Sequence, residues 1–124
     1  MTAVLWSVHC TDGPGAAERR RALRAEHSAR LGAAALRPLL YGPLLADDGE
    51  RQVGSLFVLH APDRATVQAW VDADPFLSGG VWQDVRINVL RLSDRSPVRI
   101  PEEPSLSSSS SSSSSPSPVM DPAR

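Results

Sequence analysis

The stretch that decides the fold is residues 71–81, Val-Asp-Ala-Asp-Pro-Phe-Leu-Ser-Gly-Gly-Val. Pro75 disfavours a helical backbone at the residue before it, so the helix that begins near Asp63 should end at about Ala73. Asp74 is then left as a carboxylate in an extended segment at the edge of a loop. An isolated Asp-Pro pair is most often only a helix stop, and from this stretch alone that interpretation stays open.

The second half of the stretch leads the chain towards a last strand. Phe76 and Leu77 can anchor the loop in apolar surface, and Gly79-Gly80 lets the backbone turn. Outside this stretch, hydrophobic periodicity predicts three further strands and one further helix. The strands are expected over residues 3–10, 39–42, 52–60 and 85–89, and the helices over residues 16–35 and 63–73.

The order strand, helix, strand, strand, helix, strand predicts an α+β fold of the ferredoxin-like β-α-β-β-α-β type. Its antiparallel four-stranded sheet runs fourth, first, third, second, with both helices on one face. Near its start the first strand is apolar on both sides, with Val4 and Trp6 on one and Leu5 on the other. A second copy of the chain is the simplest cover for the open face of the sheet, so we expect a homodimer.

The folded domain is expected to span residues 1–92. From Ser93 onward the chain is rich in serine and proline, with an unbroken run of serines over residues 107–115. Such a segment has little apolar surface to offset its ordering entropy, so residues 93–124 are predicted to be a disordered tail. A single domain this small buries a modest share of its surface, which is a further reason to expect a dimer.

Composition excludes several function classes. The net charge of -1 gives no electrostatic reason to expect nucleic acid or an anionic membrane as a partner. All thirteen basic residues are arginine, so a Schiff-base lysine and a Walker-type phosphate loop are excluded. The single cysteine, Cys10, fits a reducing compartment, and no secretory signal or membrane-length apolar run is evident. We therefore expect a soluble cytoplasmic protein.

The long helix carries a histidine on its buried face. Leu23, His27 and Leu31 recur at a spacing of four, and Arg20 lies on the same stripe. Arg30 lies mostly outside the stripe and is expected to remain solvated. A lone histidine on an apolar face is more often a satisfied core residue than a catalyst, so both interpretations are open.

Burial of His27 requires a polar partner, because an unpaired ring N–H in apolar surroundings costs about 1–3 kcal/mol. Asp74 is the candidate, since its loop can return over the helical layer. A carboxylate on one ring nitrogen would orient the imidazole and fix its tautomer, leaving the other nitrogen free to take a proton. That is the geometry of a general base.

Two other site types are not favoured by the sequence. His9 and His60 end antiparallel neighbouring strands and so lie at opposite ends of the sheet, while Cys10 points to the face opposite His9, so no metal site is expected. An RNA-binding domain of the same strand order is disfavoured as well. Its third strand would carry an aromatic pair for stacking bases, which residues 54–59 lack.

Several short motifs resemble those of the YciI-like (YCII-related) proteins. Residues 24–31 resemble the Arg-x-x-His-x-x-x-Leu helix of that family, residues 41–44 and 54–56 resemble its strand signatures, and residues 72–81 resemble its Asp-Pro loop. The resemblance covers residues 3–92 and implies a dimeric α+β barrel whose active site holds a His-Asp pair, here His27 and Asp74. Two features depart from the family: Ser28 stands where leucine is usual, and the serine-rich tail has no counterpart.

Two functional hypotheses follow. The first is a small enzyme that performs proton transfer with His27 and Asp74, in an isomerase, lyase or dehydrohalogenase reaction that needs no cofactor. Its substrate would be a small molecule, aromatic-derived or anionic. The second is a non-catalytic ligand-binding or accessory domain with the same pocket. The candidate substrate-binding residues are Arg20, Arg24, Ser55 and Phe76.

Overall fold

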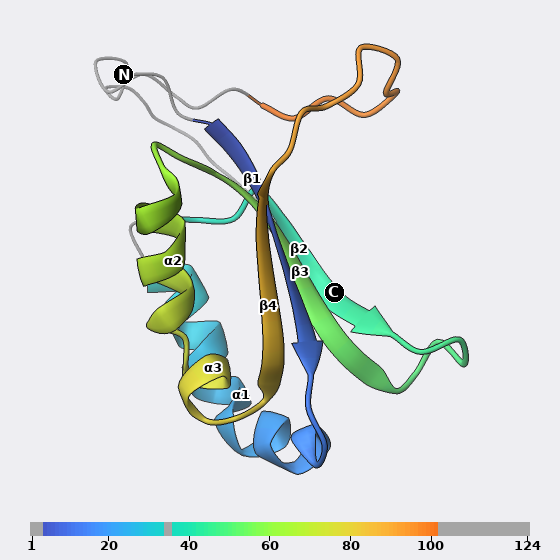
Figure 1. The fold of residues 1–124 in the computed structure, drawn as a ribbon. Helices are drawn as coiled ribbons and strands as arrows, with labels where there is room; N and C mark the ends of the chain where they lie inside the picture. The colour runs from blue at the N-terminus through green and yellow to red at the C-terminus, as the bar shows by residue number, and fades with distance from the viewer. Residues whose placement is uncertain (1–3, 34–35, 102–124) are drawn as a thin grey trace, which may run out of the picture.

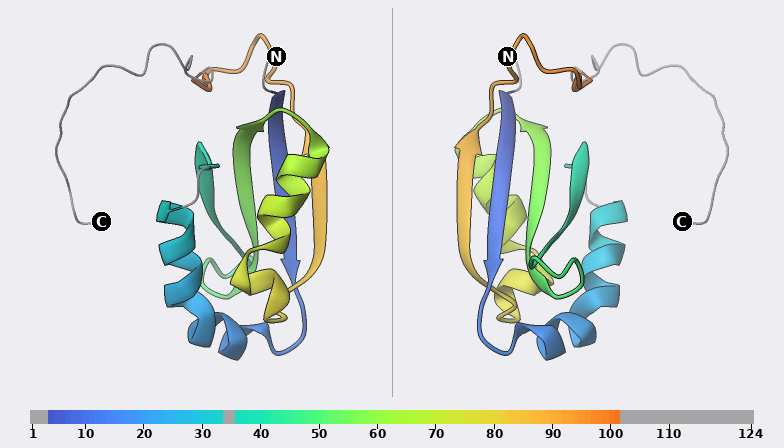
Figure 2. Two further views of the ribbon diagram at one scale, coloured as in Figure 1. Left: turned by 90° about the vertical axis from the view of Figure 1, so that its left-hand side faces the viewer. Right: turned by 90° about the vertical axis from the view of Figure 1, so that its right-hand side faces the viewer.

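The structure is a computed structural model that describes residues 4–33 and 36–101. Its elements are β1 (Val4–Asp12), α1 (Ala16–Ala33), β2 (Leu40–Leu45), β3 (Gln52–Ala61), α2 (Arg64–Asp72), α3 (Pro75–Ser78) and β4 (Trp82–Val89). The strands form one antiparallel sheet in the order β2-β3-β1-β4. All three helices cover the same face of that sheet (Figures 1 and 2). The predicted ferredoxin-like fold is confirmed.

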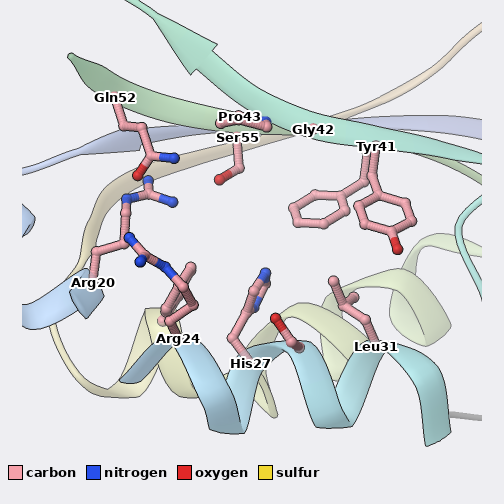
Figure 3. Close-up of a pocket in the computed structure, with 12 residues that line it drawn as sticks. Arg20, Arg24, His27, Leu31, Tyr41, Gly42, Pro43, Gln52 and Ser55 are labelled. Carbon is pink, nitrogen blue, oxygen red and sulfur yellow. The ribbon is translucent and has the colours of Figure 1, made fainter. Parts of the chain in front are cut away.

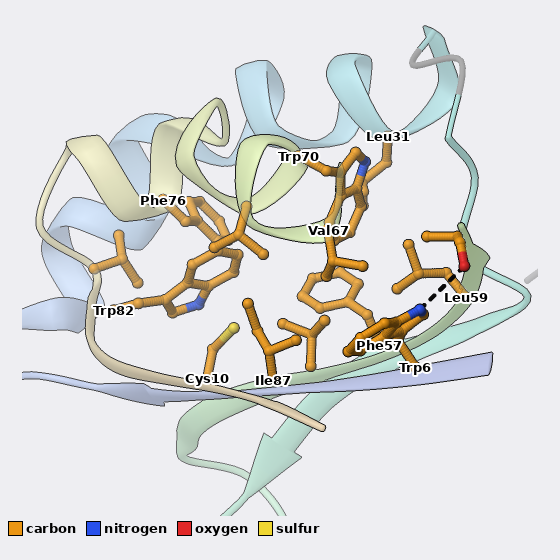
Figure 4. Packing of buried hydrophobic residues seen from close by; sticks show 14 of the residues in the cluster. Trp6, Cys10, Leu31, Phe57, Leu59, Val67, Trp70, Phe76, Trp82 and Ile87 are labelled. Carbon is orange, nitrogen blue, oxygen red and sulfur yellow. Dashed lines mark hydrogen bonds between the residues drawn. The ribbon is translucent and has the colours of Figure 1, made fainter. Parts of the chain in front are cut away.

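The core lies between the sheet and the helices. Alternate residues of β1 point to the helices, because successive side chains of a strand lie on opposite faces. On that side, β1 buries Trp6, Val8 and Cys10. Trp6 pairs with Leu59 of β3, and Val8 pairs with Phe57. The indole N–H of Trp6 donates a hydrogen bond to the carbonyl of Ala61 at 3.1 Å (Figure 4). The other large members of the core are Leu31, Val67, Trp70, Phe76, Trp82 and Ile87.

The opposite face of the sheet is more polar than the sequence predicts. Leu56 and Val58 of β3 point to it, since Phe57 between them points to the helices. On β1, however, Ser7 and His9 occupy this face, and His9 is exposed. The two-sided apolar character predicted for the first strand therefore holds at its start, where Leu5 lies on this face, and is lost in its second half.

Strand β2 extends further than predicted. It was predicted to end at Gly42, whereas the strand continues through Pro43 to Leu45. Pro43 pairs with Ser55 of β3, and β2 is an edge strand with a neighbour on one side alone. A proline is tolerated there because its missing N–H can face away from the ladder.

The segment after α2 is a short helix rather than a loop. Helix α2 ends at Asp72 with Ala73 as its C-cap, close to the predicted end. Asp74 has φ -80° and ψ 132°, the extended backbone expected before a proline, and it is the N-cap of α3. An aspartate N-cap followed by proline at the first helical position is a helix-start signal that the sequence analysis missed. Strand β4 likewise begins earlier than predicted, at Trp82.

The last two predictions concern the C-terminal tail and membrane-spanning segments. Residues 93–101 follow β4 as a loop, and Nε2 of His60 lies 2.8 Å from the carbonyl oxygen of Pro101. The rest of the predicted tail, 102–124, lies outside the described residues. Within the described ranges, no helix has the length and apolar character that crossing a membrane requires.

Candidate active site

Helix α1 and the start of α3 bring His27 and Asp74 into contact, although they lie 47 residues apart in the sequence. Nδ1 of His27 is 2.8 Å from one carboxylate oxygen of Asp74 and 3.0 Å from the other. The carboxylate is 1% exposed and the imidazole 12% exposed. An ionised carboxylate only accepts hydrogen bonds, so it favours the tautomer that carries its proton on Nδ1. Nε2 is then left with a free lone pair.

The carboxylate of Asp74 is held by two further donors. The backbone N–H of Phe76 donates to it at 2.8 Å, which is the N-cap hydrogen bond of α3. Nη1 of Arg30 donates to the other oxygen at 3.0 Å. Arg30 also donates to the carbonyl of Trp70 and lies over its ring, so the expectation that Arg30 stays solvated is wrong. A buried carboxylate with this many donors is well compensated for its loss of hydration.

Aromatic rings fix the plane of the His27 imidazole. Phe76 stacks on it with the ring centres 3.9 Å apart and the planes 8° from parallel. The rings of Phe57 and Trp82 meet it edge-on at 6.2 Å and 6.0 Å. Aromatic pairs of this kind restrict rotation as well as bury area. The hydrogen bond to Asp74 and the stack on Phe76 together define one orientation of the ring.

A pocket of about 290 Å³ opens between α1 and the strands β2 and β3, and His27 points into it (Figure 3). Five of the six predicted site residues line it, namely Arg20, Arg24, His27, Ser55 and Phe76. Asp74 does not line it, because it lies behind the histidine. The remaining lining residues are Ser28, Leu31, Tyr41, Gly42, Pro43, Gln52 and Phe57.

Arg20 has a partner that the sequence analysis did not assign. Its Nη2 donates to both oxygens of Asp12, at 2.7 and 2.8 Å, and its guanidinium lies 5.0 Å from the centre of the Phe76 ring. Asp12, the last residue of β1, thus forms a buried ion pair across to α1.

Sequence reasoning also missed Tyr41 and Gln52. Tyr41 alternates with Leu40 and Gly42 along β2, so it shares the helix-facing side with Pro43. Its ring stacks on Phe57 at 6.1 Å and remains 56% exposed. The spacing of two between Tyr41 and Pro43 was a usable signal, but the strand was predicted to end at Gly42.

Neither a reactive thiol nor a metal cluster is found near the pocket in the described part of the chain. Cys10 is buried, and burial, followed by the charges of Asp74 and Asp12, raises the pKa of its thiol to about 12. A thiol with that pKa stays protonated at neutral pH and is a poor nucleophile. In residues 4–33 and 36–101, no three His, Cys, Asp or Glu side chains gather closely enough to hold a metal ion.

Together these features define a class: a ferredoxin-like α+β domain in which a helix histidine, bound to an aspartate, points into a small pocket. The chain belongs to the YCII-related domain family, whose profile matches residues 4–91. The match covers all four strands of the sheet and all three helices. It confirms the resemblance found in the sequence motifs.

Two solved structures are similar to the chain. One is 5-chloro-2-hydroxyhydroquinone dehydrochlorinase (TftG) from Burkholderia phenoliruptrix AC1100 in complex with 2,5-dihydroxybenzoquinone, with a TM-score of 0.62 and 24% identity over 72% of this chain and 95% of that one. The other is PA3566 from Pseudomonas aeruginosa, with a TM-score of 0.44 and 24% identity over 75% and 97%. At this identity the first shows a common fold. No curated protein matches the chain.

Proposed function

We propose that the protein is a small enzyme that transfers protons without a cofactor, with His27 as the general base. The observation that carries the proposal is the geometry of the imidazole. Asp74 holds Nδ1, Phe76 holds the ring plane, and within the described residues Nε2 has no hydrogen-bond partner and is available to the pocket. A histidine held in this way differs from a core histidine with both nitrogens satisfied.

In the proposed reaction, Nε2 removes a proton from a carbon or hydroxyl group of the substrate. The imidazolium that forms is stabilised by the Asp74 carboxylate. The electron pair left on the substrate then shifts along a conjugated system, in an isomerisation, or expels a leaving group, in an elimination. In a dehydrohalogenation the halide leaves with its bonding electrons. Each of these reactions balances without an oxidant, a reductant or a metal.

Small oxygenated aromatic rings are the first substrates to test. The pocket is at the small end of the range for ligand sites, which suits a one-ring molecule. The dehydrochlorinase with the same fold acts, by its name, on a chlorinated hydroxyhydroquinone. Ser55 is 4% exposed and its hydroxyl points from β3 into the pocket, so it can hydrogen-bond to an oxygen of such a ring (Figure 3).

The test is turnover of a panel of chlorinated hydroxyhydroquinones, followed by chloride release. We expect His27→Gln to lower kcat/KM by about 10²–10⁴-fold, the usual contribution of a general base. His9→Gln is the matched control, because it removes a histidine from the open face of the sheet, and it should retain full activity. Equal turnover by wild type and His27→Gln would contradict the proposal.

The alternative is a non-catalytic domain that binds a small ligand in the same pocket. It is favoured if the panel binds with no chloride release and no exchange of substrate protons with deuterated solvent. Under that alternative His27→Gln would leave ligand affinity unchanged. A loss of turnover with ligand binding retained in that variant would instead support the enzyme.

We also propose that the protein is a homodimer that buries the open face of the sheet. Leu56 is only partly buried on that face, and Leu40 of the edge strand is 47% exposed. A domain this small gains stability by covering such a face. Sedimentation should give twice the chain mass at micromolar concentration. A well-folded monomer under those conditions would contradict this.

The folded domain is proposed to end near residue 92. The family match stops at residue 91, and the one side-chain hydrogen bond described between residues 93–101 and the sheet is that of His60 with Pro101. Truncation after Ser93 should therefore leave the melting temperature nearly unchanged. A fall of many degrees would show that the removed segment stabilises the domain.

A further inference from the structure

Helix α1 presents three arginines near the pocket, and two of them are neutralised. Arg20 pairs with Asp12 and Arg30 pairs with Asp74. Arg24 lies between these two arginines in the sequence, and its side chain lines the pocket. It forms no ion pair with any carboxylate in residues 4–33 and 36–101. The pocket therefore carries one positive charge whose counter-charge is not supplied by the described part of the chain.

The side chain of Arg20, at the same end of the pocket, has a hydrogen-bond donor that the described residues leave unsatisfied, and this is independent of the charge on Arg24. The Arg20 side chain is 6% exposed, and its Nε–H is buried without an acceptor in the described part of the chain. Buried donors are nearly always satisfied, because an unsatisfied one destabilises the fold. A ligand oxygen that reached this N–H would supply the missing acceptor.

The two ends of the pocket differ in chemistry. Figure 3 shows Arg20, Arg24 and Gln52 together at one end, and Tyr41 with Leu31 at the other. The imidazole of His27 lies between the two ends. A molecule that fills the pocket would thus place a polar group among the arginines and an apolar face against the aromatic end.

We propose that the Arg20–Arg24 end is an anion subsite and that the substrate is a planar, one-ring monocarboxylate. A carboxylate brings one negative charge and two acceptor oxygens, which matches one unpaired charge on Arg24 and one unpaired N–H on Arg20. A phosphate dianion would leave one charge uncompensated. The inference rests on the proposed function in placing the ring beside His27, while the charge preference depends on Arg24.

The experiment compares 2-hydroxybenzoate with 2-hydroxybenzamide, which has nearly the same shape and no charge. Dissociation constants are measured by NMR titration of the full chain, with the arginine Nε–Hε signals as reporters. Wild type should prefer the benzoate by about tenfold, the scale of a hydrogen bond to a charged group. The Arg20 Nε–Hε signal should shift with the benzoate and much less with the amide.

Arg24→Gln should remove the preference for the benzoate. Arg21→Gln is the matched control, because it deletes the same charge from an exposed position of α1 that does not line the pocket. It should keep the preference, as should His27→Gln. Equal affinity for the two probes in wild type, binding of neither probe, or equal losses in Arg24→Gln and Arg21→Gln would overturn the subsite.

These results separate the subsite from the proposed reaction. A benzoate preference that depends on Arg24 supports the subsite even if no substrate is turned over, in which case the proposed function fails alone. Turnover of neutral phenols that depends on His27, without any benzoate preference, overturns the subsite and leaves the proton-transfer function standing.

Discussion

Asp12 and Asp74 are both buried carboxylates that bind an arginine of α1, but they differ in what else they hold. Asp12 gives both oxygens to Nη2 of Arg20. Asp74 divides its oxygens among Arg30, the N–H of Phe76 and Nδ1 of His27. We call the first a closed pair, because the described side-chain hydrogen bonds of Asp12 all come from one arginine. The carboxylate of Asp74 instead connects the Arg30 guanidinium, the first turn of α3 and the His27 imidazole.

The difference supports the proposed role of Asp74 as the partner of a general base. A closed pair joins β1 to α1, and its described contacts involve no second titratable group. A shared carboxylate fixes the direction and the tautomer of a neighbour, and that neighbour can then act on a substrate. The side chain of Asp74 is also the less exposed of the two, at 1% against 8% for Asp12.

The largest expected effect is on the free energy of unfolding, and double substitutions should distinguish Asp12 from Asp74. Asp12→Leu should lower the free energy of unfolding by about 3–5 kcal/mol, because Arg20 is left buried and unpaired. Adding Arg20→Met should recover most of that loss, since an apolar pair can replace a closed ion pair. The measurement is urea denaturation of the two single variants and the double variant.

The same exchange should fail at the other carboxylate. In Asp74→Leu with Arg30→Met, the N–H of Phe76 and Nδ1 of His27 still lose their acceptor, at about 1–3 kcal/mol each. The double variant should thus remain clearly less stable than wild type. Full recovery in the Asp74 double variant would show that this aspartate, too, is a closed pair.

A smaller loss of stability is expected from a side chain added at Gly79, where α3 packs closely against α1. A Cβ atom at Gly79 would lie 2.2 Å from Cδ1 of Leu23 and 2.7 Å from the carbonyl oxygen of Pro75. Gly79→Ala should therefore destabilise the fold by about 1–3 kcal/mol, as overpacking does. It should also shift the NMR signals of His27 more than those of Arg20.

Gly32→Ala is the control for that prediction. No atom lies within 4 Å of the Cβ position at Gly32, which is near the end of α1. Alanine there should leave stability unchanged or raise it by up to about 1 kcal/mol, because it is the better helix former. Destabilisation by both substitutions would show that the effect is not specific to the α1–α3 contact.

Much of this arrangement was predictable from the sequence. The order of strands and helices followed from hydrophobic periodicity, and Pro75 correctly placed an extended Asp74 outside α2. The pairing of His27 with Asp74 followed from the need of a buried imidazole for a partner. The motif Arg-x-x-His then pointed to the family, which the match over residues 4–91 confirms.

The contacts of Arg30 and Asp12 were not predictable in the same way. Periodicity assigns a residue to one face of a helix, and Arg30 lies at the edge of the buried face of α1. Whether such a side chain turns inward depends on α2 and α3, which are distant in sequence. The contact of Asp12 was unpredictable for a similar reason. Its partner, Arg20, lies on α1, and the sequence of the turn after β1 does not reveal that pairing.

A pH-dependent effect is expected at Cys10, whose pKa is raised from 9.0 to about 12 by burial and then by the charges of Asp74 and Asp12. The unfolded thiol loses its proton near its ordinary pKa, while the folded thiol keeps it. The unfolded state thus binds fewer protons above that pH, so stability is complete below about pH 9 and falls towards pH 12. Cys10→Ala should flatten this part of the stability curve, and an unchanged slope would contradict the assignment.

The most direct test of the central claim is the tautomer of His27, read from ¹H–¹⁵N correlations of its ring at a pH where the ring is neutral. We predict that wild type carries the proton on Nδ1. In Asp74→Asn, the amide can donate to Nδ1, so the proton should move to Nε2. A wild-type ring with its proton on Nε2, or the same tautomer in both proteins, would contradict the claim that Asp74 prepares His27 as a base.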